Sequence, residues 1–325
     1  MRILDGLHRL KIVFNVTEDI ERSVYLYLLL GEKVHLIDTG VAGSEVRIAE
    51  YLAALGRNSK EIDSIFITHA HPDHIGSLYA LRKESDCTIY AHDSEKSWIE
   101  DIDVQYKERP IPNFYGLVAA SAPVDVTVSD GDILSPEPGI SIRVIETSGH
   151  SQGSLSFHWL EKQILFTGDA VPVAGDIPIF SNLRDSIESL KKIRSLPAVK
   201  YYAPAWDEVC DSGDGKRNLD AALACLQGIA ATVKDVLSRN TDASREEILT
   251  ATALALNLRH LSKHPLFRKS IGGVIDQALL GMLMSAFFII SVKIGNSAGR
   301  SRYAAKQRIE DGSLPKSTGS LRGFG

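Results

Sequence analysis

Three histidines and an aspartate stand close together in residues 68–76, which read THAHPDHIG. They directly follow the apolar residues 65–67, which are typical of a buried strand. Burying several titratable side chains together is costly unless something compensates them, and a divalent cation is the usual compensation. The alternation of His69 and His71, followed by the adjacent pair Asp73 and His74, can serve two neighbouring metal positions. This spacing therefore predicts a metal site in the loop after a strand.

Two further candidate ligands occur in the same local context. His150, in Gly149-His150-Ser151, follows a predicted strand over 141–146, and Asp169 follows another over 163–167. Loops at strand ends are where rigid scaffolds place functional groups, so we expect these side chains to converge with the first run. The glycines beside them allow the backbone to approach closely.

Taken together, these segments resemble the metallo-β-lactamase superfamily. The motifs that carry the resemblance are His69-x-His71-x-Asp73-His74, Gly149-His150-Ser151, Thr167-Gly168-Asp169 and the early aspartate Asp38 in LIDTG. They occur in the expected order over roughly residues 10–210, and residues 149–154 and the strand around Tyr25 are most similar to the glyoxalase II-like and lactonase-like branches. The resemblance implies an α+β protein, an αββα sandwich with a metal site at one edge between two sheets.

The resemblance also implies a role for each residue. The ligands of a first metal would be His69, His71 and His150, and those of a second would be Asp73, His74 and Asp169, with Asp169 bridging the two. Zinc, as one or two ions, suits such a site, and iron and manganese are alternatives. Asp73 would also act in catalysis by orienting a metal-activated water that attacks an acyl carbon. Asp38 would hold a ligand or its loop without touching the metal.

One position departs from the superfamily pattern. Its members usually complete the second metal position with a histidine in a Pro-Gly-His context, but residues 202–207 read YAPAWD, which puts Trp206 there. An indole N–H cannot bind a metal, so the second position has three evident ligands instead of four. Asp207 or Glu208 could replace the histidine, as could His260 or His264 from a helical stretch. Trp206 is alternatively a wall of the substrate pocket.

The first two hundred residues alternate predicted strands and helices. A helix is predicted from Ser44, with Val46 and Leu52 on its buried face and Gly56 as its stop, and another over 181–196. Mixed hairpins and helices favour layered sheets flanked by helices. Runs rich in Val, Ile, Phe and Tyr predict strands over 11–16, 24–30, 33–37, 64–68, 87–91, 141–146, 154–159, 163–167 and 201–203.

From about residue 218 the pattern becomes helical, over 219–237, 244–256 and 260–292. We therefore predict a metal-binding catalytic domain over 1–215 and a helical subdomain over 216–292. Residues 293–325 contain seven basic and two acidic side chains and few apolar ones, and they are predicted to form a flexible basic tail.

Composition limits the possible partners and compartment. The 325 residues carry a net charge of −5, which gives no electrostatic footprint for nucleic acid. Three widely spaced cysteines and the lack of a signal-peptide pattern predict a cytoplasmic protein. The apolar segment 278–292 is shorter than the roughly 20 residues of a membrane span, so a membrane role is not expected. A buried helix or a homodimer through the C-terminal helices is predicted instead.

Three functional hypotheses follow. The leading one is a metal-dependent hydrolase of a small thioester, lactone or other activated ester. The second is a mononuclear non-haem iron oxidoreductase similar to persulfide dioxygenases, with His69, His150 and Asp169 as iron ligands. The third is a non-catalytic binding protein on the same fold, which the missing ligand at Trp206 suggests and the intact ligand positions oppose.

Overall fold

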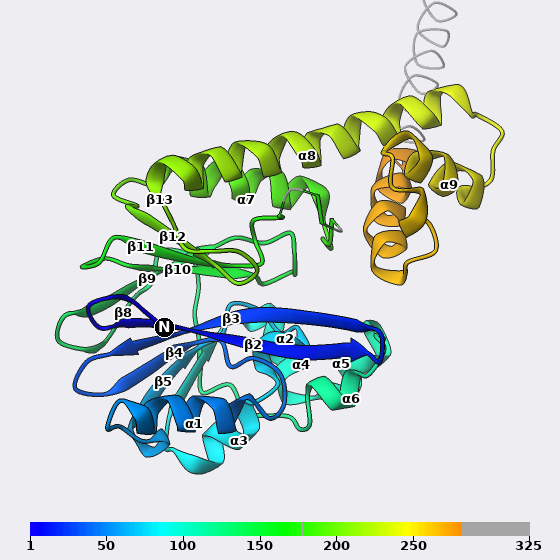
Figure 1. The fold of residues 1–325 in the computed structure, drawn as a ribbon. Helices are drawn as coiled ribbons and strands as arrows, with labels where there is room; N and C mark the ends of the chain where they lie inside the picture. Colours follow the sequence, from blue (N-terminus) through cyan, green and yellow to red (C-terminus); the bar gives the residue numbers. More distant parts are fainter. Residues whose placement is uncertain (174, 177, 281–325) are drawn as a thin grey trace, which may run out of the picture. The chain divides into compact units, whose positions relative to one another are not determined.

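The computed structural model describes residues 1–173, 175–176 and 178–280, and Met1–Ile275 form one compact unit. In this unit two β-sheets pack face to face and helices cover their outer faces (Figure 1). The fold is thus the αββα sandwich of the α+β class that the sequence predicts.

The first sheet places two of the site's loops at one edge. Strands β4, β5 and β6 are parallel, so their carboxyl ends meet on the same side of the sheet. Asp38 follows β4, and the run that begins at Thr68 follows β5. The strands of this sheet, in spatial order, are β1 (Arg2–Leu4), β2 (Leu7–Thr17), β3 (Ile20–Leu30), β4 (Val34–Ile37), β5 (Ile62–Phe66), β6 (Thr88–Ala91) and β7 (Val126–Thr127).

The second sheet supplies the remaining loops. Strand β9 leads into the loop that holds His150, and the parallel strands β11 and β12 lead to Asp169 and Trp206. The strands of this sheet, in spatial order, are β13 (Cys210–Asp211), β12 (Tyr201–Pro204), β11 (Ile164–Gly168), β10 (Leu155–Trp159), β9 (Ile140–Glu146) and β8 (Ile133–Glu137). All nine predicted strands are confirmed, whereas the short or partly exposed β1, β7, β8 and β13 were not predicted.

Alternation along the strands builds two cores. In β3, Tyr27 and Leu29 belong to the core between the sheets, whereas Leu26 and Leu28 belong to the core under the helices. All four side chains are buried. A strand covered on both faces reads as a nearly continuous apolar run, which is how β3 appears in the sequence.

Helices connect several of the strands along the chain. They are α1 (Ser44–Ala54), α2 (Pro72–Ile75), α3 (Leu78–Glu84), α4 (Asp93–Glu100), α5 (Ile102–Glu108), α6 (Phe114–Leu117), α7 (Leu183–Ser195), α8 (Ser212–Arg239) and α9 (Arg245–Ala255), with 3₁₀ turns at Ser59–Glu61 and Arg259–Leu261. The buried face predicted for α1 is wrong at Val46, which is 55% exposed. Ser44, Ile48 and Leu52, spaced four apart, are the buried residues of α1.

The C-terminal region is helical, as predicted. Helix α8 begins after Asp211, whose carboxylate caps the backbone N–H groups of Gly213 and Asp214. It packs against α7, β12, β13 and α9. By length and composition alone α8 is apolar enough to cross a membrane, and 33% of its apolar window is buried within the protein, including Leu226.

A further helical stretch covers residues 265–280. The rest of the predicted apolar segment, 281–292, and the predicted tail, 293–325, lie outside the described residues. The homodimer expected through these helices and the domain boundary at residue 216 stay predictions.

Candidate metal centre

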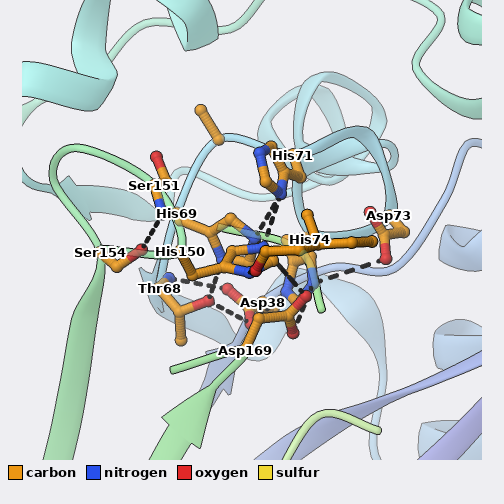
Figure 2. Close-up of polar contacts among 12 residues, drawn as sticks. Asp38, Thr68, His69, His71, Asp73, His74, His150, Ser151, Ser154 and Asp169 are labelled. Atoms are coloured by element: carbon orange, nitrogen blue, oxygen red, sulfur yellow. Dashed lines mark hydrogen bonds and ion pairs between the residues drawn. The ribbon is translucent and has the colours of Figure 1, made fainter. Parts of the chain in front are cut away.

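The six candidate ligands come from the carboxyl ends of three strands, and Figure 2 shows their side chains gathered together. The segment after β5 contributes His69, His71, Asp73 and His74, the loop after β9 contributes His150, and the residue after β11 is Asp169. Their ligand atoms form two groups, in each of which all atoms lie within 4.8 Å of one another. Asp169 belongs to both groups, so the structure brings together all six residues singled out in the sequence.

His150 presents an unprotonated nitrogen to the first group. Its Nδ1 lies 3.0 Å from the carbonyl oxygen of Ile179, which can only accept, so Nδ1 carries the ring proton. Burial lowers the pKa of His150, which leaves the ring neutral with a lone pair on Nε2. That Nε2 lies 2.9 Å from Nδ1 of His71.

The same reasoning holds for His69. Thr68 donates its hydroxyl proton to Asp38 at 2.8 Å and therefore accepts the Nδ1 proton of His69 at 3.0 Å. Burial holds the pKa of His69 well below its ordinary value, so its Nε2 also carries a lone pair, 2.9 Å from the same Nδ1 of His71. One nitrogen cannot satisfy two facing lone pairs, whereas a divalent cation between the three rings can. The residues present fit a metal ion.

The second group has three candidate metal ligands, one fewer than the first group. Nε2 of His74 lies 3.2 Å from Oδ1 of Asp169 and 3.6 Å from Oδ2 of Asp73. The other oxygen of Asp169, Oδ2, lies 3.3 Å from Nε2 of His150, so this carboxylate spans the two groups. Nε2 of His74 and Oδ1 of Asp169 are both buried without a hydrogen-bond partner, as expected for atoms that face a cation.

The charges of the second group oppose one another. Burial lowers the pKa of His74, but Asp169, Asp38 and Asp73 outweigh it and hold that pKa well above the ordinary value. Burial raises the pKa of Asp73. In Asp169 the neighbouring His74 and other imidazoles outweigh burial and hold the pKa far below the usual range. The shared carboxylate is therefore ionised, as a bridging metal ligand must be.

Asp38 orients two of the imidazoles. Its Oδ2 accepts hydrogen bonds from Nδ1 of His74 and from the hydroxyl of Thr68, both at 2.8 Å, and its Oδ1 accepts the backbone N–H of Thr68 at 2.8 Å. Through Thr68 it also fixes the tautomer of His69. A carboxylate that orients a ligating histidine in this way raises its basicity and fixes its direction. Its position fits the role that the resemblance implied.

Sequence reasoning missed two residues that hold the loops of the site in place. The buried Glu95 accepts the backbone N–H of Ala70 at 2.9 Å and that of Gly153 at 2.6 Å, together with the hydroxyl of Ser151. Gln105, also buried, donates to the carbonyl of Ala70. Glu95 thus ties the loop of His69 and His71 to the loop of His150, whereas Gln105 holds the first of these loops only. A single glutamate on a predicted helix gives no sequence signal of such a role.

The residues considered as replacements for the missing histidine are not members of either ligand group. Trp206 packs against the core and lines the same cleft as Asp73 and Asp169, which agrees with its alternative role as a pocket wall. Glu208 is held by an ion pair with Arg9 at 2.6 Å and by the hydroxyl of Tyr25 at 2.8 Å.

Two other replacement candidates differ in position. Asp207 lines a separate cavity with Tyr202 and Cys210, whereas His264 lines the cleft of the site. Within the described part of the chain, the second group contains only Asp73, His74 and Asp169.

Two clefts meet at the candidate metal centre. The apolar cleft, of about 230 Å³, is lined by side chains such as Phe14, Ile111, Val171 and Trp206, and it contains Asp73 and Asp169. The second cleft, called the polar cleft because it is the more polar of the two, has about 250 Å³ and is lined by polar side chains such as Ser97, Gln152, Lys269 and Ser270, together with the apolar Trp98 and Phe180. Both clefts share His71, Arg109, His150, Ile179 and Leu266. Arg109, which the sequence analysis did not identify, therefore stands beside the ligand cluster.

A family model described as the metallo-β-lactamase superfamily matches residues 19–206, which is more than half of the chain. The chain belongs to this superfamily. A hydroxyacylglutathione hydrolase from Rhodopseudomonas palustris is 29% identical over 170 residues, which cover 51% of this chain and 58% of the relative. A probable metallo-hydrolase from Methanocaldococcus jannaschii is 28% identical over 191 residues, or 57% of this chain and 88% of the relative.

Solved structures support the fold. A β-lactamase domain protein from Burkholderia ambifaria has a TM-score of 0.64 at 16% identity, covering 87% of this chain and 88% of that one. A metallo-β-lactamase family protein from Thermus thermophilus has a TM-score of 0.60 at 22% identity, covering 80% of this chain and 93% of that one. The resemblance to the superfamily and its glyoxalase II-like branch is confirmed. The chain spans little more than half the length of the first hydroxyacylglutathione hydrolase.

Proposed function

We propose that the protein is a metal-dependent hydrolase that cleaves a small thioester, lactone or other activated ester. The observation that carries the proposal is the convergence of unprotonated nitrogens of His69 and His150 on His71, beside a carboxylate that spans a second ligand group. Zinc is the proposed metal, as one or two ions, because three imidazoles and a carboxylate form a donor set that suits it.

The chain's own residues divide the work in this proposal. His69, His71 and His150 hold a first metal, and Asp73, His74 and the shared Asp169 hold a second. A divalent cation in this site supplies two effects, a lowered pKa for water and polarisation of the substrate carbonyl.

Asp73 is proposed to orient the attacking water and to accept its proton, since its carboxylate lines the apolar cleft beside the ligand cluster. The substrate is proposed to be a small molecule, because the two clefts that reach the site are small volumes rather than an extended groove.

The geometry favours this proposal over the iron oxidoreductase hypothesis. A mononuclear iron site of that kind needs two histidines and one carboxylate with open positions. Here a third imidazole, His71, lies 2.9 Å from both His69 and His150, whereas Asp169 lies 3.8 and 3.3 Å from them. All four candidate ligands of the first group lie together, and this argues against a non-catalytic role.

The experiment that tests the proposal combines metal analysis with a substrate panel. Protein purified without chelator or histidine tag should contain one or two equivalents of zinc. It should hydrolyse activated thioesters or lactones, and a chelator should abolish this activity in a way that zinc restores. One equivalent of iron together with oxygen consumption on a persulfide would favour the oxidoreductase. No bound metal, even after reconstitution, would overturn the proposal.

A further inference from the structure

We infer that the protein has a second small-molecule site, which binds a small apolar monoamine in its protonated form. The site is the cavity of about 210 Å³ that Asp207 lines together with Tyr202 and Cys210. It is called the α8 cavity below, because Gly215 and Leu219 of α8 also line it. None of the six candidate metal ligands lines it, so the inference does not rest on the proposed hydrolase function.

The walls of the α8 cavity suit a hydrocarbon body. Pro204 and Leu219 line it, as do Val171, Pro172 and Val173, which also line the apolar cleft. An apolar cavity of roughly 150 Å³ holds benzene, so this larger space has room for a six-carbon ring with a short polar arm.

The charge that lines the α8 cavity is negative. Among the described residues of its lining, Asp207 is the one charged side chain, and no lysine or arginine contributes. The Asp207 carboxylate accepts the backbone N–H of Glu208 at 2.7 Å and has no ion pair within the described residues. Burial raises the pKa of Cys210, and the charges of Asp207 and Asp211 raise it further. The α8 cavity therefore favours a cation.

The positive side chains near the α8 cavity are already paired. Burial raises the pKa of Tyr202 although the charge of Arg194 opposes this, and Arg194 is itself bound to Asp220 at 3.0 Å. Arg9 forms an ion pair with Glu208 at 2.6 Å. Neither arginine lines the cavity, so neither competes with a bound cation for Asp207.

The N-terminus of α8 carries a partial positive charge, which by itself would favour an anion. The carboxylate of Asp211 caps it by accepting the backbone N–H groups of Gly213 and Asp214. Asp214 adds a second negative charge in the first turn. The end of this helix is therefore neutralised by the chain's own carboxylates.

Two buried hydroxyls supply further acceptors. Thr167 and Tyr202 both line the α8 cavity and are 1% and 4% exposed. Their hydroxyl oxygens have no hydrogen-bond partner in the described part of the chain, although such groups are nearly always hydrogen-bonded in folded proteins. An ammonium group has three N–H donors, enough for the Asp207 carboxylate and these two oxygens.

The test measures the binding of four probes to the full chain by ligand-detected NMR titration. The probes are cyclohexylmethylamine, cyclohexylmethanol, cyclohexanecarboxylate and methylamine. An aliphatic amine has a pKa of about 10.4 and is protonated at neutral pH. We expect cyclohexylmethylamine to bind about tenfold tighter than the alcohol, the value of one charged hydrogen-bonded contact. It should bind at least about tenfold tighter than methylamine, which lacks the ring.

Equal binding of the amine and the alcohol, tightest binding of the carboxylate, or binding of no probe would overturn the inference. Amines also bind zinc, so the titration is made on the protein as purified and again after chelation. The affinity for cyclohexylmethylamine should be the same in both, because no candidate metal ligand lines the α8 cavity. Loss of binding on chelation would place the amine at the metal centre and overturn the inference. Unchanged amine binding in a protein that hydrolyses no ester would overturn the proposed function alone.

Variants assign the binding to particular side chains. Asp207→Asn should weaken the binding of cyclohexylmethylamine about tenfold, to the level of the alcohol, and leave the alcohol unchanged. Asp235→Asn is the matched control, because Asp235 is an exposed carboxylate of α8 that does not line the cavity. Tyr202→Phe should weaken amine binding about two- to fivefold, since it keeps the ring that packs against Gly215 and removes one acceptor.

A blocking variant keeps the test valid if Asp207→Asn does not fold. Ala221 lines the α8 cavity from an exposed position, so Ala221→Trp should abolish binding of every probe without disturbing the core. Circular dichroism establishes that each variant is folded. Undiminished amine binding in folded Asp207→Asn or Ala221→Trp would show that the amine binds elsewhere.

Discussion

The two ligand groups of the metal centre share Asp169 but differ in how fully they are built. In the first group, His69 and His150 each have the second ring nitrogen engaged, by Thr68 and by the carbonyl of Ile179. Their free nitrogens point at the same place. In the second group His74 is oriented just as firmly by Asp38, yet only two carboxylates face it.

The difference teaches that the two positions can change independently. The position of the missing histidine, Trp206, follows β12, whereas the first group depends on loops after β5, β9 and β11. Loss of a ligand after β12 therefore leaves the geometry of the first group intact. We expect the first position to bind metal more tightly than the second.

The largest effect is expected at the centre of the first group. His71 is the residue on which two other imidazoles converge, so His71→Ala should lose bound metal and at least about 1000-fold of the hydrolysis rate. Elemental analysis and initial rates measure the two losses. His260→Ala, at an exposed histidine, is the control and should change neither. Undiminished turnover in His71→Ala would show that the first group is not the catalytic metal site.

The next largest effect is expected at Asp38, which supports a ligand in each group. Asp38→Asn replaces an acceptor oxygen and should weaken metal binding about 10- to 100-fold. Competition with a chromogenic chelator measures the affinity. Asp220→Asn, in an exposed ion pair with Arg194, should leave that affinity as it is. An unchanged affinity in Asp38→Asn would mean that the imidazoles are oriented without it.

A smaller effect is expected from restoring the superfamily's ligand. Trp206→His should strengthen metal binding at the second position by about tenfold, so that the metal content rises toward two per chain at limiting zinc. Trp206→Phe keeps an aromatic wall without a ligand and should leave the content unchanged. If the wild-type protein already binds two ions with equal affinity, the contrast between the groups is wrong.

The smallest effect is expected at a buried histidine that belongs to neither ligand group. His35 is fully buried between Asp63 and Glu137 at 3.8 and 3.7 Å, and burial lowers its pKa from 6.5 despite both carboxylates. The unfolded chain therefore binds more protons, so stability is lost as the pH falls below about 6.5.

His35→Gln should remove this loss of stability, which we expect to be on the order of 1 kcal/mol by about pH 5, while metal content stays at the wild-type level. Chemical denaturation between about pH 5 and 8 measures the free energy of unfolding of both chains. A pH dependence identical to that of the wild-type chain would assign the effect to other groups.

Local patterns predicted most of the fold. The strands from β2 to β6 and from β9 to β12 are apolar runs with clear turn residues, and α7, α8 and α9 begin after the capping side chains Asn182, Asp211 and Ser244. The weak point was the buried face of α1, where Val46 was expected inside and lies outside. A helix's core face depends on what packs against it, and sequence spacing alone leaves several faces nearly equivalent.

The sequence by itself determined the identity of the six candidate ligands and their strand-end setting, because metal ligands must be His or Asp and their spacing is short and unusual. Only the tertiary structure decided that Glu95 joins two loops and that Arg109 stands where two clefts meet. Glu95 lies in α4 and Arg109 follows the end of α5, so neither belongs to the loops that carry the ligands. Their chemistry depends on burial and on the neighbours that the two sheets bring together, and the local sequence specifies neither of these.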